Sequence, residues 1–323
     1  MRRVGIILCG LAFAAPLRSE EKKLDPDVVR RLIEQLADPA LEQRDAAARR
    51  LKEFGRPLLP FIEKAFDHAN PEIRRRARLV KKSLPVWWGT PKPGSKYDSE
   101  SSLPLRVVDH RTGFELVLIR PGTYKRGASA DDREALDSEK PAHKAEVKRY
   151  FYLAPHELTQ RQWLKVMAQN PSHEQGPEYP VTNVSWNAIQ AFLKKAGMRL
   201  PTEVEWEYAC RAGTAGPRYG LLNKIAWHPG NAEQKIHIVG RKRPNNFGLF
   251  DMLGNVWEWC ADAYVEYDGF PPPAGADLGR NPSRVIRGGC FAAERLYVRA
   301  SVRWPCGPDK GWFHVGFRVA RDP

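Results

Sequence analysis

The residues best suited to chemistry gather near the end of the chain, between Cys290 and His314. Aromatic side chains mixed with arginine dominate recognition hot spots, because they bury large areas and make directional contacts. We therefore expect a binding surface in this block. The alternative is that its arginines, together with Arg287 and Arg318, make structural hydrogen bonds to loop carbonyls. The residues expected to contact a ligand are Cys290, Glu294, Arg299, Trp304, Trp312 and His314.

Covalent and acid–base catalysis have weaker support in the sequence. Ser185, His143 and Asp262 supply the three residue types of a hydrolase triad, but no serine lies in a Gly-x-Ser-x-Gly elbow. Helix capping explains Ser185 better. The acidic cluster Glu203, Glu205 and Glu207 follows Thr202, a pattern that predicts a capped helix start with negative charge near its N-terminus.

Cysteine is the remaining reactive residue type. Beyond the N-terminal segment the chain has Cys210, Cys260, Cys290 and Cys306. These four allow three complete disulfide pairings in an oxidising compartment. Single buried thiols are equally compatible with the sequence, since free cysteine packs as a small hydrophobic residue. The sequence leaves the pairing open.

The elements that position these residues belong to a chain of 323 residues with 42% hydrophobic content, enough for one large and one small folded domain. Residues 1–19 have the pattern of a secretory signal: Met1-Arg2-Arg3 is basic, and the apolar run from Val4 to Ala15 is too short to span a bilayer. No later segment has the length and hydropathy of a transmembrane helix. We expect export to the periplasm or the exterior.

The formal net charge is +14, but lysine and arginine are spread along the chain and mixed with acids. This distribution argues against a specific nucleic-acid site, which needs a concentrated patch. The densest run, Arg74 to Arg76 with Arg78, Lys81 and Lys82, falls on a predicted helix. An ordinary exposed helix face and contact with an anionic surface both remain open for it.

Residues 20–86 read as short helices separated by breaks. Apolar residues recur at helical spacing, and Asp38-Pro39 and Asn70-Pro71 interrupt the pattern. Paired helices with such breaks look like HEAT-type repeats, of which about two would fit, and a partner could bind them. Residues 87–104 are rich in proline, glycine and serine, which predicts a linker.

Residues 105–323 carry an ordered series of motifs that resembles one family. The series is Pro121-Gly122-Thr123-Tyr124, Glu157-Leu158-Thr159-Gln160, Pro180 to Trp186, Arg199 to Ala209, Asn245 to Trp259, and Arg287-Gly288-Gly289 with Gly316-Phe317-Arg318. This order resembles the formylglycine-generating enzyme or sulfatase-modifying factor family. The resemblance implies an α+β fold of the C-type lectin-like kind, rich in loops and preceded here by a small all-α HEAT-like segment.

In catalytic members of that family, two cysteines near Arg-Gly-Gly bind copper and use oxygen to convert a substrate cysteine to formylglycine. The matching positions here are Ala293 and Val298. Neither side chain can supply a thiolate, which cuprous ion needs. Cys290 lies where the family usually has serine, and one cysteine gives no dithiolate site. We therefore expect no catalytic residues and no copper; the alternative is a formylglycine-generating oxidoreductase with a non-standard site.

The resemblance also implies a calcium site. In it, Asp251 and Glu258 supply carboxylates while Gly254 and Val256 supply main-chain carbonyls. Hard oxygen donors at close spacing suit Ca²⁺ better than a transition metal. The alternative is that Glu258 and Asn255 only hydrogen-bond the loop backbone. A second family calcium site would begin at Asn231, but its later acidic element is missing from the shortened segment that follows.

These expectations combine into one prediction. The chain is an exported domain of this family that has lost the catalytic cysteine pair and serves as a binding or scaffolding module. The pocket where family enzymes hold a peptide would then take a protein, peptide or glycan, contacted by the residues between Cys290 and His314.

Overall fold

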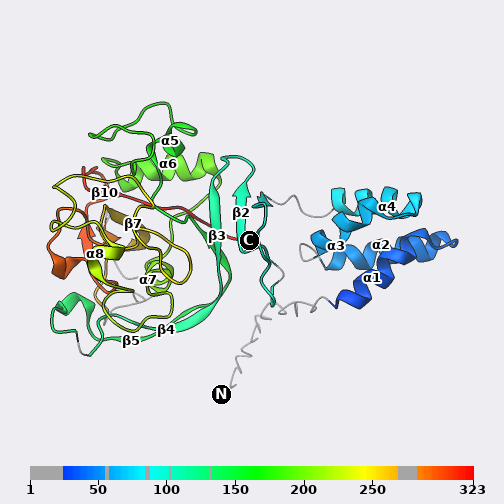
Figure 1. The fold of residues 1–323 in the computed structure, drawn as a ribbon, viewed down its shortest axis with the longest axis horizontal. Helices are drawn as coiled ribbons and strands as arrows, with labels where there is room; N and C mark the ends of the chain where they lie inside the picture. Colours follow the sequence, from blue (N-terminus) through cyan, green and yellow to red (C-terminus); the bar gives the residue numbers. More distant parts are fainter. Residues whose placement is uncertain (1–24, 55–57, 84–87, 102, 131, 268–281) are drawn as a thin grey trace, which may run out of the picture. The chain divides into compact units, whose positions relative to one another are not determined.

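The structure is a computed structural model of the chain, and it describes residues 25–54, 58–83, 88–101, 103–130, 132–267 and 282–323 (Figure 1). The predicted signal segment, residues 1–19, lies outside the described residues. The chain forms two compact units, Met1–Val86 and Trp87–Pro323. Within the described residues, no helix has both the length and the apolar character needed to cross a membrane.

The first unit is entirely helical in its described residues. Asp25 begins it as an N-cap whose carboxylate accepts from Asp27 N–H, and Asn70 does the same for Glu72 N–H before the last helix. Buried aliphatic residues from every helix, such as Val29, Leu51 and Ile62, form one core. The predicted helices are confirmed, whereas their HEAT-like character stays a prediction. The helices are α1 Pro26–Glu34, α2 Leu41–Glu53, α3 Leu59–Lys64 and α4 Pro71–Ser83.

Most cations of the dense basic run on α4 have partners inside this unit. Arg76 bonds Asp45 and Glu72 at 2.8 and 2.7 Å. Arg75 bonds the same Glu72, and Arg74 donates to the carbonyls of residues 68 and 69. The run is therefore mainly an internally paired helix face rather than a free cationic patch.

The second unit is built on three small sheets joined by long loops. The largest has five antiparallel strands in the order β1-β2-β3-β6-β11, which brings the end of the chain beside its middle. Val117 of β3 pairs with Leu153 of β6, and Leu153 pairs with Ala320 of β11. The strands are β1 Gly89–Pro91, β2 Arg106–Asp109, β3 Glu115–Ile119, β6 Phe151–Leu153 and β11 Ala320–Arg321.

The other two sheets carry the candidate surfaces. One has the order β10-β7-β8-β9, with β10 parallel to β7 and the other neighbours antiparallel. The other is the ribbon of β4 and β5, which runs along one side of the unit (Figure 1). Their strands are β4 Gly122–Arg126, β5 His143–Val147, β7 Trp257–Ala263, β8 Arg284–Arg287, β9 Arg303–Cys306 and β10 Val315–Gly316.

Three helices of the second unit, α5, α6 and α7, begin at the predicted capping residues. Thr159, Ser185 and Thr202 each accept from the backbone N–H three residues on, and Gln162 and Glu205 complete capping boxes. These caps fix where α6 and α7 start. The helices are α5 Gln160–Leu164, α6 Trp186–Ala196, α7 Glu203–Arg211 and α8 Leu222–Ile225.

The prediction of a linker at residues 87–104 is wrong for the part that the structure describes. Thr90 in β1 pairs with Val108 in β2, and the Trp88 indole donates to the Asp322 carbonyl. Asp98 is buried and accepts from the backbone and hydroxyl of Ser101. Proline and glycine here make turns between pairing segments instead of an open tether.

Candidate functional site

Four arginines in or beside the C-terminal block point inward. Arg287, Arg299, Arg303 and Arg318 are all fully buried. Arg303 makes two 2.8 Å bonds to Glu203, and Arg287 pairs with Glu207 while donating to the Ser301 carbonyl at 2.8 Å. A guanidinium has five donors and no acceptor, so it needs several such partners when buried; the Arg287 Nε is buried without a hydrogen-bond partner. The structural alternative for Arg287, Arg303 and Arg318 is correct.

Glu203 and Glu207 are more than a favourable helix start. Both are fully buried on α7, where Glu203 also receives Arg126 of β4 at 2.5 Å. Three nearby guanidinium groups lower the pKa of Glu203 against the opposing effect of burial. Together these pairs connect α7 to β4, β8 and β9, and they hold the C-terminal block in place.

The prediction that Arg299 contacts a ligand is wrong. Its side chain is fully buried and bonds Glu139 at 2.7 and 2.8 Å and Asp132 at 2.6 Å. Ser301 donates to the same Glu139 at 2.5 Å. Arg299 therefore fastens the 132–139 loop to the core, because a buried cation requires a paired anion.

Cys290 is also misplaced as a ligand contact, since it is 3% exposed and packs in the main core. All four cysteines in the described residues are free of disulfides. Burial raises the pKa of Cys290 to about 11 and that of Cys210 to about 12, and it raises the pKa values of Cys260 and Cys306 as well. These thiols resist forming the thiolates that copper chemistry needs.

Aromatic residues of the same block point outward. Trp304 is 44% exposed, Trp312 43% and Phe313 55%. Tyr297 meets Trp304 edge-on at 5.7 Å between ring centroids, and His314 lies 6.1 Å from Trp312 and 4.7 Å from Phe313. The Trp312 side chain lies next to the half-buried thiol of Cys306. Cys306 is two residues from Trp304 in β9, so the two side chains are on the same face of the strand. We call these five aromatic side chains the aromatic strip: Tyr297, Trp304, Trp312, Phe313 and His314.

Strand alternation separates the two sets of side chains. In β9, the edge strand of its sheet, Arg303 points to the buried carboxylate of Glu203, and the next residue, Trp304, points to the opposite face, where it stays 44% exposed. The predicted contacts Trp304 and Trp312 are thus exposed, Glu294 is exposed, and His314 is half-buried with its pKa lowered by burial. Four of the six predicted contacts are accessible on this block.

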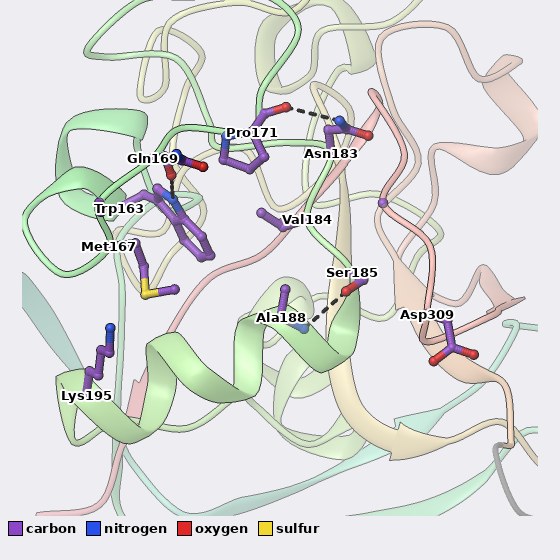
Figure 2. A pocket seen from close by; sticks show the side chains of 12 residues that line it. Trp163, Met167, Gln169, Pro171, Asn183, Val184, Ser185, Ala188, Lys195 and Asp309 are labelled. Carbon is purple, nitrogen blue, oxygen red and sulfur yellow. Dashed lines mark hydrogen bonds between the residues drawn. The ribbon is translucent and has the colours of Figure 1, made fainter.

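An open pocket of about 480 Å³ is shown in Figure 2, and its lining includes Gly311, which precedes Trp312 of the aromatic strip. Its walls come from the segment after α5, the start of α6 and the loop at 309–311. We call it the α6 pocket; Lys195 lies at one side and Asp309 at the other (Figure 2). Its lining residues are Trp163, Met167, Ala168, Gln169, Pro171, Asn183, Val184, Ser185, Ala188, Lys195, Asp309 and Gly311.

Polar groups of this pocket keep hydrogen-bonding capacity. The Asn183 amide nitrogen donates to the Pro171 carbonyl at 3.0 Å, which leaves its carbonyl oxygen as an acceptor. The Ser185 oxygen accepts from Ala188 N–H at 3.1 Å and retains its own hydroxyl proton. Asn183 N–H donates to the Trp312 carbonyl, so the pocket wall and the aromatic strip are one connected structure.

The three residues of the supposed hydrolase triad have separate tasks. Ser185 caps α6, and the His143 ring packs edge-on to Tyr267 and contacts the Pro141 carbonyl. Asp262 accepts from Glu203 N–H at 2.6 Å, and burial raises its pKa to about 6. None of these contacts joins one member of the trio to another, so the structure gives no support for a triad.

The predicted calcium loop is buried, and its two carboxylates, Asp251 and Glu258, differ in their hydrogen-bond partners. Glu258 makes 2.6 and 2.7 Å bonds to Arg318 and accepts from the Trp206 indole at 2.7 Å. Asp251 Oδ2 accepts from Gly240 N–H, whereas its Oδ1 is buried without a hydrogen-bond donor. Gly254 has a φ of 79°, and a Cβ there would strike the Trp227 backbone. The turn is therefore built for glycine, and Asp251 has the unsatisfied oxygen.

Glu157 also belongs to this cluster, although the sequence predicted no role for its carboxylate. It is fully buried, its Oε1 accepts from Asn255 at 3.0 Å, and its Oε2 has no donor. Burial, followed by the charges of Asp251 and Glu258, raises the Glu157 pKa, and burial raises that of Asp251 to about 6. Glu157 was noticed only as part of a family motif, because its neighbours in space are about 100 residues away.

Side chains alone do not complete a metal site. In the described part of the chain, no group of three or more histidine, cysteine, aspartate or glutamate side chains could hold a metal ion. At the second possible calcium site, Asn231 already accepts from His228 N–H and donates to the Ala226 carbonyl. Any cation at the first loop would thus depend on main-chain carbonyls beside Asp251.

Small mixed sheets, long loops and the return of the last strand to the middle of the chain define a C-type lectin-like fold of the α+β class. Residues 105–323 match the family described as sulfatase-modifying factor enzyme 1-like domain. This match covers well over half of the chain. The chain belongs to that family.

Known relatives include proteins named as enzymes and one named as inactive. The formylglycine-generating enzyme of Streptomyces coelicolor is 37% identical over 170 residues, covering 45% of this chain and 54% of the relative. The inactive C-alpha-formylglycine-generating enzyme 2 of Mus musculus is 34% identical over 163 residues, covering 44% and 49%. The chain thus spans about half the length of these curated relatives.

Solved structures agree on the fold. PvdO from Pseudomonas aeruginosa has a TM-score of 0.59 at 27% identity, covering 66% of this chain and 96% of that one. Treponema denticola variable protein 1 has a TM-score of 0.58 at 26% identity, covering 72% and 100%. The match therefore covers nearly the whole of both solved chains and leaves part of this longer chain unmatched.

Proposed function

We propose that the second unit is a non-catalytic binding module whose ligand is a peptide segment of another protein, held on the aromatic strip and the α6 pocket. One observation carries this proposal: the C-terminal block buries Arg299 and Arg303 and exposes Trp304, Trp312 and Phe313. Exposed tryptophans beside a pocket are typical anchors of recognition surfaces.

Loss of the oxidase chemistry supports the same conclusion. The positions of the family cysteines hold Ala293 and Val298, and Val298 is fully buried in an apolar core. The thiols that remain have raised pKa values because they are buried. An inactive relative in Mus musculus provides a precedent for this family without catalysis. The rival proposal, an oxidoreductase with a non-standard site, would need a thiolate from one of the buried cysteines.

A peptide fits the α6 pocket better than a sugar does. The pocket offers an unused acceptor on Asn183 and an unused hydroxyl proton on Ser185, which complement a backbone N–H and carbonyl. Its aromatic wall, Trp163, stacks on Phe192 at 5.1 Å and is 3% exposed, so its face is not available to a sugar ring. The pocket volume lies in the range of ordinary ligand sites.

Selection of peptides on the wild-type protein, followed by affinity measurement on variants, tests this function. Trp312→Ala and Ala188→Trp should each weaken a selected peptide at least tenfold, the first by removing an anchor and the second by filling the pocket. Leu221→Ala is the matched control, because Leu221 is 78% exposed elsewhere on the unit. Equal affinities for all four proteins, or selective capture of glycans on a parallel array, would contradict the peptide proposal.

The oxidase alternative has its own measurement. Cuprous ion is titrated into the reduced protein, and a cysteine-containing peptide is then incubated with it under oxygen. We expect no stoichiometric tight site and no conversion of the cysteine to formylglycine, because no thiolate pair is present. Conversion of the peptide would overturn the non-catalytic proposal.

We further propose that the buried loop beside Asp251 binds calcium. The residues fit in part: Asp251 Oδ1 and Glu157 Oε2 are buried oxygens without donors, which a hard cation would satisfy. Asp251 would hold the ion with the carbonyls of Gly254 and Val256. Glu258 is already neutralised by Arg318, so its contribution would be weaker than the sequence predicts. A bound ion would supply structural support here and no chemistry.

A further inference from the structure

The ribbon of β4 and β5 has a hollow on its outer face, away from the aromatic strip. Lys125 and Lys144 are direct partners across the two strands, and both are exposed. Because alternate residues share a face, Thr123 lies beside Lys125 on this side, and Ala142 lies beside Lys144. These side chains and the strands between them border a hollow of about 380 Å³; its lining residues are Thr123, Tyr124, Lys125, Ala142, His143 and Lys144.

The groups that border the hollow are hydrogen-bond donors. Each ammonium has three N–H donors and no acceptor, and the Thr123 hydroxyl can donate as well. No carboxylate lines the hollow. Ala142 has a small side chain, so it leaves space beside Lys144. A ligand that matches these groups must carry several acceptor oxygens and negative charge.

The two cations have no partner that would neutralise them. Within the described part of the chain, neither Lys125 nor Lys144 has a carboxylate at ion-pair distance, whereas nearby Lys140 is paired with Asp137. Like charges directly opposite each other on antiparallel strands repel. The inner face of the same ribbon contrasts with this, because Arg126 pairs there with buried Glu203. On the outer face of these two strands, Glu146 lies opposite Thr123 and two residues from Lys144, so the face carries two lysines and one carboxylate, which does not line the hollow.

We propose that this hollow binds a tetrahedral oxyanion, the phosphate or sulfate group of a small ligand, between Lys125 and Lys144. Such a group has three or four acceptor oxygens, which the two ammonium groups and the Thr123 hydroxyl would share. The volume leaves space for an organic part attached to the anion. The proposal does not depend on peptide binding at the aromatic strip, because no residue is common to the two surfaces.

The experiment titrates sodium phosphate, sodium sulfate and sodium acetate into the full chain at constant ionic strength, set with sodium chloride. Calorimetry and thermal melting report binding. We expect a saturable response to phosphate or sulfate and a weaker one to acetate, which has two oxygens. The comparison of the phosphate and sulfate arms identifies which group the site prefers.

Variants separate a site from a general salt effect, because sulfate stabilises most proteins through exclusion from their surface. Lys125→Gln with Lys144→Gln should weaken anion binding at least tenfold, while Lys125→Arg with Lys144→Arg should retain it. Lys148→Gln with Lys194→Gln removes the same net charge from exposed lysines outside the hollow and should bind like the wild type.

Two results would overturn the proposal: a wild-type protein without a saturable response, or equal losses in the two glutamine pairs. The second result would show that only net charge matters. In chloride alone, the Lys125→Gln and Lys144→Gln pair should melt no lower than the wild type, since it removes a repulsion. This melting temperature confirms that a loss of binding does not come from misfolding.

Discussion

The two faces of the C-terminal block use similar residue types for opposite purposes. On the inner face, Arg299, Arg303 and Arg318 are fully buried and each has a carboxylate partner. On the outer face, Trp304 and Trp312 expose more than two fifths of their surface. Composition alone therefore cannot distinguish a recognition surface from a structural one. The distinction depends on which side of β9 a residue occupies and on whether its charge has a partner.

The strongest way to break this comparison is to remove a buried arginine. Arg299→Ala leaves Glu139 and Asp132 without their common cation, and breaking a buried ion pair costs about 3–5 kcal/mol. We expect urea unfolding to show a loss of this size, or a protein that does not fold. Arg295→Ala, at an exposed neighbour, is the control and should change the free energy of unfolding by less than about 0.5 kcal/mol.

A second variant keeps this test informative if Arg299→Ala fails to fold. Arg299→Met combined with Glu139→Leu and Asp132→Asn replaces the buried charges by side chains of similar size. Such replacements of buried ion pairs are often neutral or stabilising. We expect the triple variant to be more stable than Arg299→Ala. Equal stability of Arg299→Ala and the wild type would show that Arg299 is not a structural residue.

The pH dependence of stability tests the buried carboxyl cluster of Asp251 and Glu157, and the expected effect is smaller than that of Arg299→Ala. Asp251 has a pKa of about 6 in the fold against an ordinary 3.8, and Glu157 is also raised. A raised carboxyl pKa favours the fold when the group is protonated, so this stability is complete below about pH 4 and is lost as pH rises through about 6. For Asp251 the loss is at most about 3 kcal/mol.

Calcium should remove this pH dependence if it binds, because a cation lowers both pKa values. The measurement is urea unfolding between pH 4 and 7, with calcium and with chelator. Asp251→Asn should abolish the difference between the two conditions, whereas Glu258→Gln is the wrong control because it breaks the Arg318 pair. Identical pH curves with and without calcium in the wild type would contradict the calcium proposal.

Local sequence patterns predicted the caps and the helices but not the side that each residue faces. Thr159 and Thr202 were recognisable because capping involves residues three apart. The partners of Arg299 and Arg303 are 160 and 100 positions away, so no local pattern identifies them. The α6 pocket likewise combines Trp163, Ser185 and Asp309 from three distant segments.

The family motifs predicted the fold and the loss of the cysteine pair, since Ala293 and Val298 can be compared position by position. They were less reliable for contacts. Cys290 and Arg299 were grouped with Trp304 because they share a stretch of sequence, whereas Trp304 alone of these three lies on the edge strand β9, where it stays 44% exposed. The linker prediction failed for a related reason: glycine and proline mark turns, and pairing with β2 depends on residues farther along the chain.

Thiol labelling tests whether the cysteines of the C-terminal block are buried, and the expected effect is a change in reaction rate. Burial raises the pKa of Cys290 from 9.0 to about 11, so its thiolate fraction at pH 8 falls about a hundredfold. We expect the native protein to react with a disulfide reagent far more slowly than the protein unfolded in urea, with half-buried Cys306 reacting first. Rapid labelling of Cys290 in the native protein would show that it is accessible on the outer face.

The smallest expected effect concerns the aromatic strip itself. Trp304→Ala and Trp312→Ala remove side chains that are largely exposed, so each should change the free energy of unfolding by less than about 1 kcal/mol, well below the loss for Arg299→Ala. Urea unfolding measures this, with Phe317→Ala as the buried aromatic control, expected to cost about 3–5 kcal/mol. If the tryptophan variants lose as much stability as Phe317→Ala, these rings support the core, and the binding surface must be sought in the α6 pocket alone.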